Sequence, residues 1–350
     1  MRFDKVPKLS ICIATFNRGA FIAETLNSIL SQNSEQIEIV VVDGGSKDNT
    51  QKVLEFYQNS FSNFNYYREE VNSGVDIDYD KAIQYANGYY CWLMTDDDLL
   101  IDGAIERLLC KLIDNYDLLV LNSEVWNTDF TFNLETRMST MIQDKIYTGR
   151  NKLEMFADLG TCLSFIGSVV IRRRVWLERV REKYYGSLFV HVGVIFQSPI
   201  ENDVYFHAEP IIKIRYGNGM WSPRSFEIWY FKWPELVWSF GSFEDLSKSK
   251  IVMREPWRRY WLLIKSRAIG EYTWKEYETH FSKLSWSISR LLTYSICFIN
   301  PKLLNFILVI LYVCFKPRLK YTIFDLIRSR NSSRFSRRFV IFFNPNMLPK

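Results

Sequence analysis

The chain has 350 residues, of which 48% are hydrophobic and 24% charged, and its formal net charge at pH 7 is +5. This length and apolar content suffice for one catalytic domain with a smaller appendage. The positive excess is concentrated in the C-terminal tail and no nucleic-acid module is recognisable, so the charge does not indicate a nucleic-acid partner. Six cysteines without CxxC spacing favour reduced thiols, and because no signal peptide precedes the first predicted strand we expect a cytoplasmic protein.

Alternating strands and helices are predicted for the first hundred residues. An apolar run predicts the first strand, helical spacing of apolar residues predicts the helix after it, and a continuous β-branched run is typical of a central parallel strand. The predicted elements are strand 9–14, helix 20–31, strand 38–42, helix 50–58, strand 63–68, helix 76–87 and strand 89–95. This order predicts an α/β fold with a largely parallel sheet and right-handed crossovers.

Polar clusters follow three of these strands. They are Thr15, Asn17 and Arg18 after the first strand, Asp43 and Gly44 after the second, and Asp96, Asp97 and Asp98 after the last. Ligands of open α/β sheets bind outside the carboxyl ends of the strands, so we expect the clusters to converge on one crevice. Three successive carboxylates favour Mg²⁺ or Mn²⁺ holding a diphosphate, and the alternative is a solvated turn that caps the next helix. The chain has neither a GxGxxG motif nor a P-loop, which disfavours an NAD site.

These motifs resemble those of glycosyltransferase family 2, whose members have the GT-A fold. Ser10–Arg18 is similar to the opening strand and nucleotide loop of the family, Val42–Thr50 to its second-strand motif and Thr95–Asp98 to its DXD-type metal motif, in the same order and spacing. The resemblance implies a Rossmann-like, mostly parallel sheet flanked by helices. It also implies a transferase that uses Mn²⁺ or Mg²⁺ and moves a sugar from a nucleotide donor.

The resemblance assigns a role to each residue of the first two clusters. It implies that Asp43 hydrogen-bonds the nucleobase beside Gly44, and that Thr15, Asn17 and Arg18 line the nucleoside pocket. For Asp43 the alternative is a turn former before two glycines.

The acidic triplet would hold the ribose and the metal. If Asp96 and Asp98 form the DXD pair, Asp98 is the direct metal ligand. If the pair is Asp96 and Asp97, Asp98 is only a neighbour, and the sequence leaves both registers open.

Two further segments, Asn72–Lys81 and Tyr90–Asp98, are most similar to the O-antigen abequosyltransferases of this family. Those enzymes move a 3,6-dideoxyhexose from a CDP-sugar to a lipid-linked oligosaccharide, so the resemblance favours a CDP-sugar, with a UDP-sugar as the alternative. Asp76 and Asp78 would then lie on the donor side. Their alternative is an acidic first turn stabilised by the helix dipole.

The catalytic base is harder to place. Inverting members of the family usually carry a Glu-Asp pair in the second half of the domain, and residues 189–203 contain no such pair. His191 lies in this region and could act as the base, since its ordinary pKa suits proton transfer near neutrality, or as a metal ligand. The alternative interpretation is that His191 is a hydrogen-bonded residue of the core. Asp203 and Glu201 are the other candidates.

We expect a domain boundary near Gly217. The nucleotide-sugar half would cover about 1–100 and the acceptor half about 101–216, with strands at 163–172 and 210–215, and a helical, aromatic and basic region would follow from 217 to 350. Most of its tryptophans are expected to fill a helical core. Trp221, in a segment rich in Gly, Ser and Pro, is the candidate for an acceptor loop.

The C-terminal part favours a membrane surface. The apolar run 303–315 is too short to span a bilayer, and the tail that follows contains many Lys and Arg but a single acid, Asp325. We therefore expect a segment attracted to anionic lipids at the inner face of the cell membrane, where a lipid-linked glycan acceptor is reached. A buried helical hairpin or a dimer contact is the alternative. For the whole chain, the alternatives to a transferase are a catalytically silent scaffold subunit and a sugar nucleotidyltransferase.

Overall fold

The computed structural model describes residues 6–285 and 287–348. These residues divide into two compact units. Unit 1 contains the residues up to Glu124 together with Thr136–Ile214 and Phe240–Ile251, and unit 2 contains Val125–Glu135, Arg215–Ser239 and the residues from Val252 onward. The chain passes from unit 1 to unit 2 after Ile214, two residues before the predicted end of the catalytic domain. Two short segments are exceptions: Val125–Glu135 belongs to unit 2, and Phe240–Ile251 belongs to unit 1.

A ten-stranded mixed sheet has the order β3-β2-β1-β4-β9-β6-β10-β5, with β7 beside β6 and β8 beside β10. Its strands are β1 (Leu9–Thr15), β2 (Ile37–Asp43), β3 (Phe64–Arg68), β4 (Tyr90–Met94), β5 (Leu99–Leu100), β6 (Leu118–Trp126), β7 (Asn133–Glu135), β8 (Lys145–Tyr147), β9 (Val169–Arg172) and β10 (Val204–Arg215). The first four strands in this order are parallel, and β9 pairs antiparallel with both β4 and β6. The predicted βαβ order is therefore confirmed for the first half, while in the second half β5, β7, β8 and β9 pair antiparallel with their neighbours.

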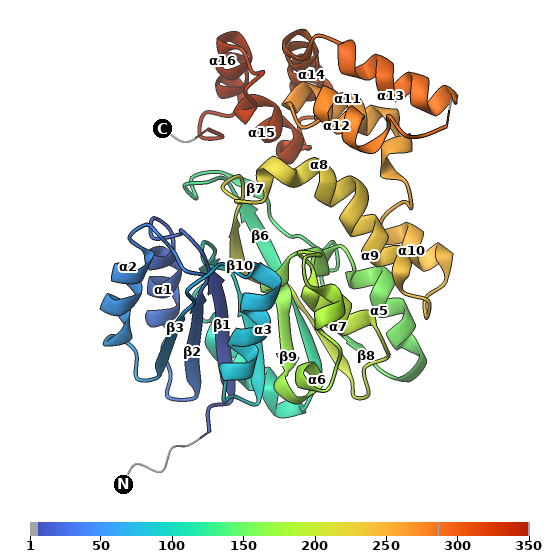
Figure 1. Ribbon diagram of the computed structural model, residues 1–350. Coiled ribbons are helices and arrows are strands. Elements are labelled where there is room, and N and C mark those ends of the chain that lie inside the picture. The colour runs from blue at the N-terminus through green and yellow to red at the C-terminus, as the bar shows by residue number, and fades with distance from the viewer. Residues whose placement is uncertain (1–5, 286, 349–350) are drawn as a thin grey trace. The chain divides into compact units, whose positions relative to one another are not determined.

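The helices of unit 1 cover the sheet (Figure 1). They are α1 (Ile22–Leu30), α2 (Thr50–Gln58), α3 (Val75–Tyr85), α4 (Ala104–Lys111), α5 (Lys152–Leu159), α6 (Arg173–Leu177), α7 (Val190–Phe196) and α10 (Asp245–Ile251). The apolar faces of α1 and α2 share one buried cluster with alternate residues of β1 and β2. Because side chains alternate across a strand, the other residues of these strands face α3, which contacts β1 and β2 and lies outside that cluster.

Two predicted strands have different bounds in the structure. The segment predicted as a strand over 163–172 forms short 3₁₀ turns at Cys162–Ser164 and Ile166–Ser168, and the strand starts only at Val169. The hydroxyl of Ser168 donates to the carbonyl of Phe165 at 2.7 Å, a local bond that competes with strand pairing. The strand predicted at 210–215 is longer and begins at Val204.

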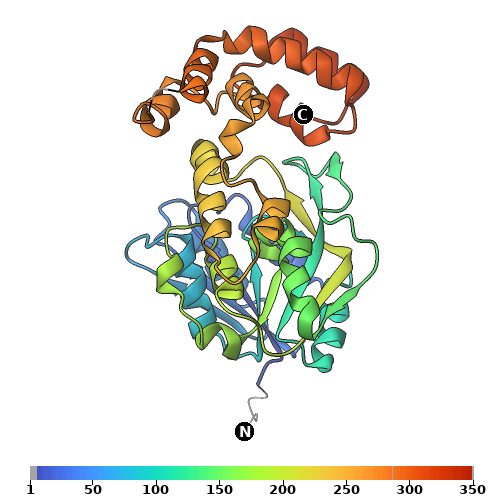
Figure 2. The ribbon, with the colours of Figure 1, turned by 90° about the vertical axis from the view of Figure 1, so that its right-hand side faces the viewer.

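Unit 2 is helical, as the sequence predicts, apart from the short strand β7 and the last residues of β6 and β10. Its helices are α8 (Ser225–Glu227), a π-helix (Ile228–Lys232), α9 (Trp233–Ser239), α11 (Tyr260–Ile269), α12 (Trp274–His280), α13 (Ile288–Phe298), α14 (Pro301–Phe315), α15 (Lys320–Arg328) and α16 (Arg334–Phe343). Figure 2 shows α11 to α16, in orange to red, from a second direction. Aromatic residues form much of the buried core, including Phe226, Tyr272 and Phe281.

No single helix among the described residues is long and apolar enough to cross a membrane. The helices α13 and α14 together reach the required length and composition, but they are bent by 95° at the break between them. The six cysteines are free thiols, four of them buried, while Cys110 and Cys314 are exposed rather than part of the core.

Candidate functional site

The register of the parallel strands brings the three polar clusters of unit 1 to one edge of the sheet. Thr15 is opposite Asp43 in the β1–β2 pair, and Ile13 is opposite Met94 in the β1–β4 pair. The amide of Gly44 donates to the carbonyl of Thr15 at 2.9 Å, so the loops after β1 and β2 stay joined beyond the strand ends. The convergence predicted from the sequence is therefore present.

Asp43 organises the loop that follows β2. Its side chain is fully buried, with Oδ1 accepting from the amide of Ser46 at 2.8 Å and Oδ2 accepting from the hydroxyl of Tyr66 at 3.0 Å. Arg68 Nε lies 3.9 Å from Oδ2. Each carboxylate oxygen has two lone pairs, so Asp43 could accept a hydrogen bond from a ligand in addition to those from the protein. Tyr66 and Arg68 were missed by the sequence interpretation, although their spacing of two places both side chains on one face of β3.

The loop after β1 is held by the loop after β2. Asn17 has a positive φ of 53°, a conformation that Asn tolerates better than most residues. Its amide donates to Ser46 Oγ at 2.8 Å, and its Oδ1 accepts from the amide of Lys47 at 2.7 Å. The amide of Arg18 donates to Thr50 Oγ1 at 2.9 Å. These bonds fix the position from which the Arg18 side chain extends.

Arg18 joins the first and third clusters. Its Nε lies 3.2 Å from Asp96 Oδ1, and its Nη2 donates to Asp97 Oδ2. The side chains are 8%, 13% and 13% exposed for Arg18, Asp96 and Asp97, so this is a largely buried cluster of two acids and one base. Burial, and then the charge of Asp97, raise the pKa of Asp96 to about 7 against the opposing effect of Arg18. The cluster therefore holds more negative charge than its guanidinium compensates.

Asp98 has a different environment from its two neighbours. It is 2% exposed and accepts a hydrogen bond from the hydroxyl of Thr95. No group of three or more His, Cys, Asp or Glu side chains is placed to hold a metal ion among the residues that the structure describes. Mg²⁺ is commonly bound by one or two carboxylates together with phosphate oxygens and water, so two acids of the triplet would fit a cation that a diphosphate also coordinates.

Asp78 borders the loop after β2. Its Oδ1 accepts from the hydroxyl of Ser73 at 2.9 Å, and a Cβ added at Gly44 would lie 2.9 Å from its Oδ2. Glycine at 44 thus allows the acid and the loop backbone to approach each other. Burial raises the pKa of Asp78 to about 6.

Asp76 reaches a segment that is distant in sequence. It is 4% exposed and accepts from the backbone amides of Leu188 at 2.8 Å and Val190 at 3.1 Å. Phe189, the residue before α7, has no side chain that can cap the helix. Asp76 therefore takes the place of a capping residue and fixes the N-terminus of α7.

His191 is the second residue of α7 and is 1% exposed. Its Nε2 lies 2.8 Å from the carbonyl oxygen of Leu163, which only accepts, so Nε2 carries the proton and Nδ1 has a free lone pair. Within the described part of the chain, Nδ1 has no hydrogen-bond partner. Burial lowers the pKa of His191 to about 4, and the ring is neutral at pH 7.

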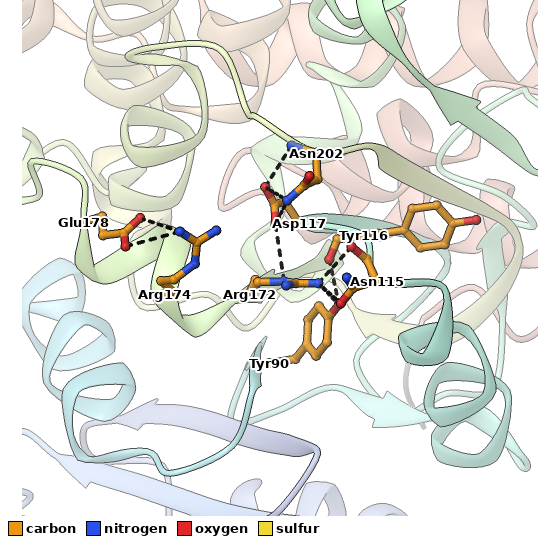
Figure 3. A network of polar contacts seen from close by, with 8 residues as sticks. All are labelled: Tyr90, Asn115, Tyr116, Asp117, Arg172, Arg174, Glu178 and Asn202. Atoms are coloured by element: carbon orange, nitrogen blue, oxygen red, sulfur yellow. Dashed lines mark hydrogen bonds and ion pairs between the residues drawn. The ribbon is translucent and has the colours of Figure 1, made fainter.

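Glu201 and Asp203 lie at the opposite end of the sheet. Next to them, Asn202 donates to Asp117 at 3.0 Å through its amide, and Asp117 lies 3.3 Å from Arg172 Nε (Figure 3). Arg172 in turn donates to the hydroxyl of Tyr90, at the start of β4. The length of β4, about 13 Å, separates this network from the acidic triplet. The structure thus does not bring Glu201 or Asp203 to the other site residues.

Trp221 belongs to unit 2 and is 42% exposed. Its ring lies 6.0 Å from that of Trp229 in an edge-to-face arrangement. Its proposed place in an acceptor loop stays a prediction.

Residues 10–181 match the sequence model of the family described as Glycosyl transferase family 2. The chain is 28% identical over 206 residues to the abequosyltransferase RfbV of Salmonella typhimurium, covering 55% of this chain and 62% of that protein. It is 30% identical over 112 residues to the GalNAc(5)-diNAcBac-PP-undecaprenol beta-1,3-glucosyltransferase of Campylobacter jejuni, covering 32% of this chain and 36% of that one. The chain thus matches less than two thirds of the length of either relative.

The fold is similar to that of residues 1–349 of TarS from S. aureus, solved in complex with UDP. The TM-score is 0.52 at 14% identity, and the alignment covers 95% of this chain and 92% of that one. The same TarS segment in complex with UDP-GlcNAc also gives a TM-score of 0.52, at 16% identity. The predicted resemblance is thereby confirmed: residues 10–181 match the model of glycosyltransferase family 2, and the fold is of the GT-A type.

Proposed function

We propose that this protein is a metal-dependent glycosyltransferase that moves a sugar from a nucleotide donor to a lipid-linked glycan. The observation that carries the proposal is the buried cluster in which Arg18 binds Asp96 and Asp97 beside the loop of Asp43. A scaffold subunit would gain nothing from a buried pair of carboxylates in which burial and the charge of Asp97 raise the pKa of Asp96, whereas a cation and a diphosphate would use the pair. RfbV is named for the transfer of abequose, and the Campylobacter glucosyltransferase for the transfer of glucose to an undecaprenol-linked glycan.

The donor is proposed to bind across the three strand ends. Asp43 would accept from the nucleobase while Asn17 and Arg18 border the nucleoside, and the acids at 96 to 98 would hold the ribose and a Mn²⁺ or Mg²⁺ ion. The bound cation would neutralise the diphosphate as it becomes the leaving group. Asp96 belongs to both registers of the acidic pair, so the variants Asp97→Asn and Asp98→Asn decide between them. The resemblance to RfbV supports a CDP-sugar with a 3,6-dideoxyhexose, and UDP in TarS supports the alternative.

Residues of this chain are also proposed to bind the acceptor hydroxyl. The free Nδ1 lone pair of the neutral His191 ring would accept the hydrogen bond of that hydroxyl and orient its oxygen. Because burial lowers its pKa to about 4, the ring is neutral at pH 7 and would orient the hydroxyl rather than keep its proton. Asp76 acts as a positioning residue, because it fixes the helix that carries His191. Glu201 and Asp203 are not included, since they lie at the other end of the sheet.

The C-terminal helices of unit 2 support attachment to an anionic membrane surface. One face of α14 exposes Leu303, Ile307, Leu311 and Phe315, at intervals of four residues, with exposed fractions between 41% and 77%. After Glu278 the sequence has twelve Lys and Arg residues and a single acid, Asp325. An apolar helix face flanked by basic residues is the pattern that lies in the plane of a lipid interface.

Vesicle flotation tests this surface. We expect the protein to bind vesicles of phosphatidylglycerol and phosphatidylcholine more than phosphatidylcholine alone, with less binding at high salt. The double variant Leu303→Ser, Phe315→Ser should lose binding, whereas Phe56→Ser, which removes a 71% exposed phenylalanine on α2 of unit 1, should not. Unchanged flotation of the double variant, or its conversion of a dimer to a monomer by light scattering, would contradict the membrane proposal.

Release of nucleoside diphosphate tests the transferase proposal itself. CDP-abequose, UDP-glucose and UDP-N-acetylglucosamine would each be incubated with the protein and Mn²⁺, and the products separated by chromatography. We expect release from one of them, abolished by chelation and by Asp96→Asn and unchanged by Asp102→Asn, which alters an exposed acid nearby. No binding and no release with any donor would favour the scaffold alternative.

A further inference from the structure

Unit 2 contains a cavity of about 750 Å³ that the donor site does not use. Its walls come from the π-helix and α9, from the segment around Arg254 and from the end of α12 and the residues after it. All lining residues belong to unit 2. The volume lies within the range of about 300–1,000 Å³ that is usual for small-molecule sites.

Aromatic rings form most of the walls. Trp238 is held by a hydrogen bond of 3.1 Å from its Nε1 to the carbonyl of Val252, and Trp257 packs on Phe281 with ring centroids 5.3 Å apart. Phe231 stacks on His280 at 4.2 Å. These rings are fixed by contacts within unit 2, so a ligand would meet a preformed surface.

The helix along one wall is interrupted at the cavity. The amide of Trp233 bonds to the carbonyl of Ile228, five residues back, and the next residue is Pro234, which has no amide proton to donate. The proline removes the ordinary bond to the carbonyl of Tyr230, and the wider π-turn accommodates its ring. Tyr230 and Phe231, which lie in this π-turn, both line the cavity, and such turns occur frequently at binding sites.

The charges facing the cavity balance. Glu255 is paired with Arg258 at 2.5 Å, whereas within residues 6–285 and 287–348 neither Glu235 nor Arg254 forms an ion pair. Burial lowers the pKa of His280, so its ring is neutral at pH 7. One carboxylate and one guanidinium remain, which together offer acceptors and donors without net charge. A phosphate or a nucleotide would require a positive excess, while a neutral polyol uses both groups and its apolar ring face packs on aromatic rings.

We propose that this cavity binds a neutral sugar ring, with Glu235 and Arg254 hydrogen-bonding its hydroxyls and the aromatic walls packing on its C–H face. Given the proposed function, that sugar belongs to the acceptor glycan, and the cavity is a specificity site for the acceptor.

Ligand-observed NMR on the full chain tests the proposal. The probes are the methyl glycosides of glucose, galactose, mannose and rhamnose at millimolar concentration, and saturation transfer from the protein reports binding. We expect transfer to the ring protons of at least one glycoside and at least tenfold weaker binding in Glu235→Gln and in Arg254→Gln, because each removes a charge-assisted hydrogen bond. Glu278→Gln, the same change at an exposed acid on α12 that does not line the cavity, should bind as the wild type does.

Three results would overturn the proposal. They are the absence of transfer to all four glycosides, unchanged binding in both cavity variants with wild-type melting temperatures, and displacement of a bound glycoside by inorganic phosphate. Binding of CDP and UDP is measured on the same samples. If a nucleotide binds and no glycoside does, the sugar-binding cavity is refuted while the proposed transferase function stands. Glycoside binding without any nucleotide binding would contradict the proposed transferase function.

Discussion

Replacing Asp96 by Asn should stabilise the protein in the absence of ligands. The ionised carboxylate of Asp96 is largely buried beside Asp97, and its pKa is raised from 3.8 to about 7 even though Arg18 is in contact with it. Asn has the same shape and carries no charge. The variant therefore removes a buried charge that lowers the stability of the folded protein. We infer that this charge is kept because it binds the ligand.

The size and the pH range of the effect follow from the pKa. Between about pH 4 and pH 7 the folded protein keeps the Asp96 proton while the unfolded chain has lost it, so the contribution of Asp96 to the free energy of unfolding falls as the pH rises. The rise of this pKa from 3.8 to about 7 corresponds to at most about 4 kcal/mol above pH 7. The difference between variant and wild type should be near zero at pH 4.

Thermal unfolding at pH 4.5, 6 and 8 measures this difference. For a unit of about this size, 1 kcal/mol corresponds to about 2–4 °C, so the variant should melt several degrees higher at pH 8 and at nearly the same temperature at pH 4.5. Asp102→Asn, at an exposed acid nearby, should melt as the wild type does at every pH. A variant that is less stable than the wild type at pH 8, or a difference independent of pH, would refute the reasoning.

Three further predictions concern other parts of unit 1. Gly45→Ala should lower stability by about 1–2 kcal/mol, because Gly45 has a φ of 78° and an added Cβ would lie 3.0 Å from the carbonyl of Glu69, whereas Gly241→Ala, with open space around it, should have little effect in the same melting assay. His191 should remain neutral with its proton on Nε2 down to about pH 4, which ¹⁵N-labelled histidine NMR detects, and titration near pH 6.5 would contradict its burial. Asp117→Ala should cost about 3 kcal/mol by leaving Arg172 without its carboxylate, yet leave nucleotide binding unchanged in calorimetry, since this network lies at the far end of the sheet.

The parallel half of the fold was predictable because its signals are local. The continuous β-branched run predicts β2 at 38–42, and its observed bounds are Ile37–Asp43. The helix predicted at 50–58 is observed as α2, Thr50–Gln58. The convergence of the polar residues at the strand ends followed from the predicted order of the parallel strands. The site that they form was therefore largely visible in the sequence.

What the sequence did not show depends on contacts between distant segments. The bonds from Asp76 to the segment before α7 join residues more than a hundred positions apart, and nothing in either segment indicates them. Pro210 obscured the start of β10, since a proline argues against a strand interior. In the structure it lies between the residues that pair with β8 and those that pair with β5, where no amide donor is needed on that side.

Binding of nucleoside diphosphates tests the central claim most directly. Melting temperatures would be compared with CDP, UDP, GDP and dTDP, each with and without Mn²⁺, for the wild type and for Asp96→Asn, because a ligand that binds only the folded state raises the melting temperature. We predict a Mn²⁺-dependent increase with CDP or UDP in the wild type, and its loss in the variant. No increase with any nucleotide, or the same increase in Asp96→Asn, would contradict the assignment of the strand-end cluster as a nucleotide-sugar site.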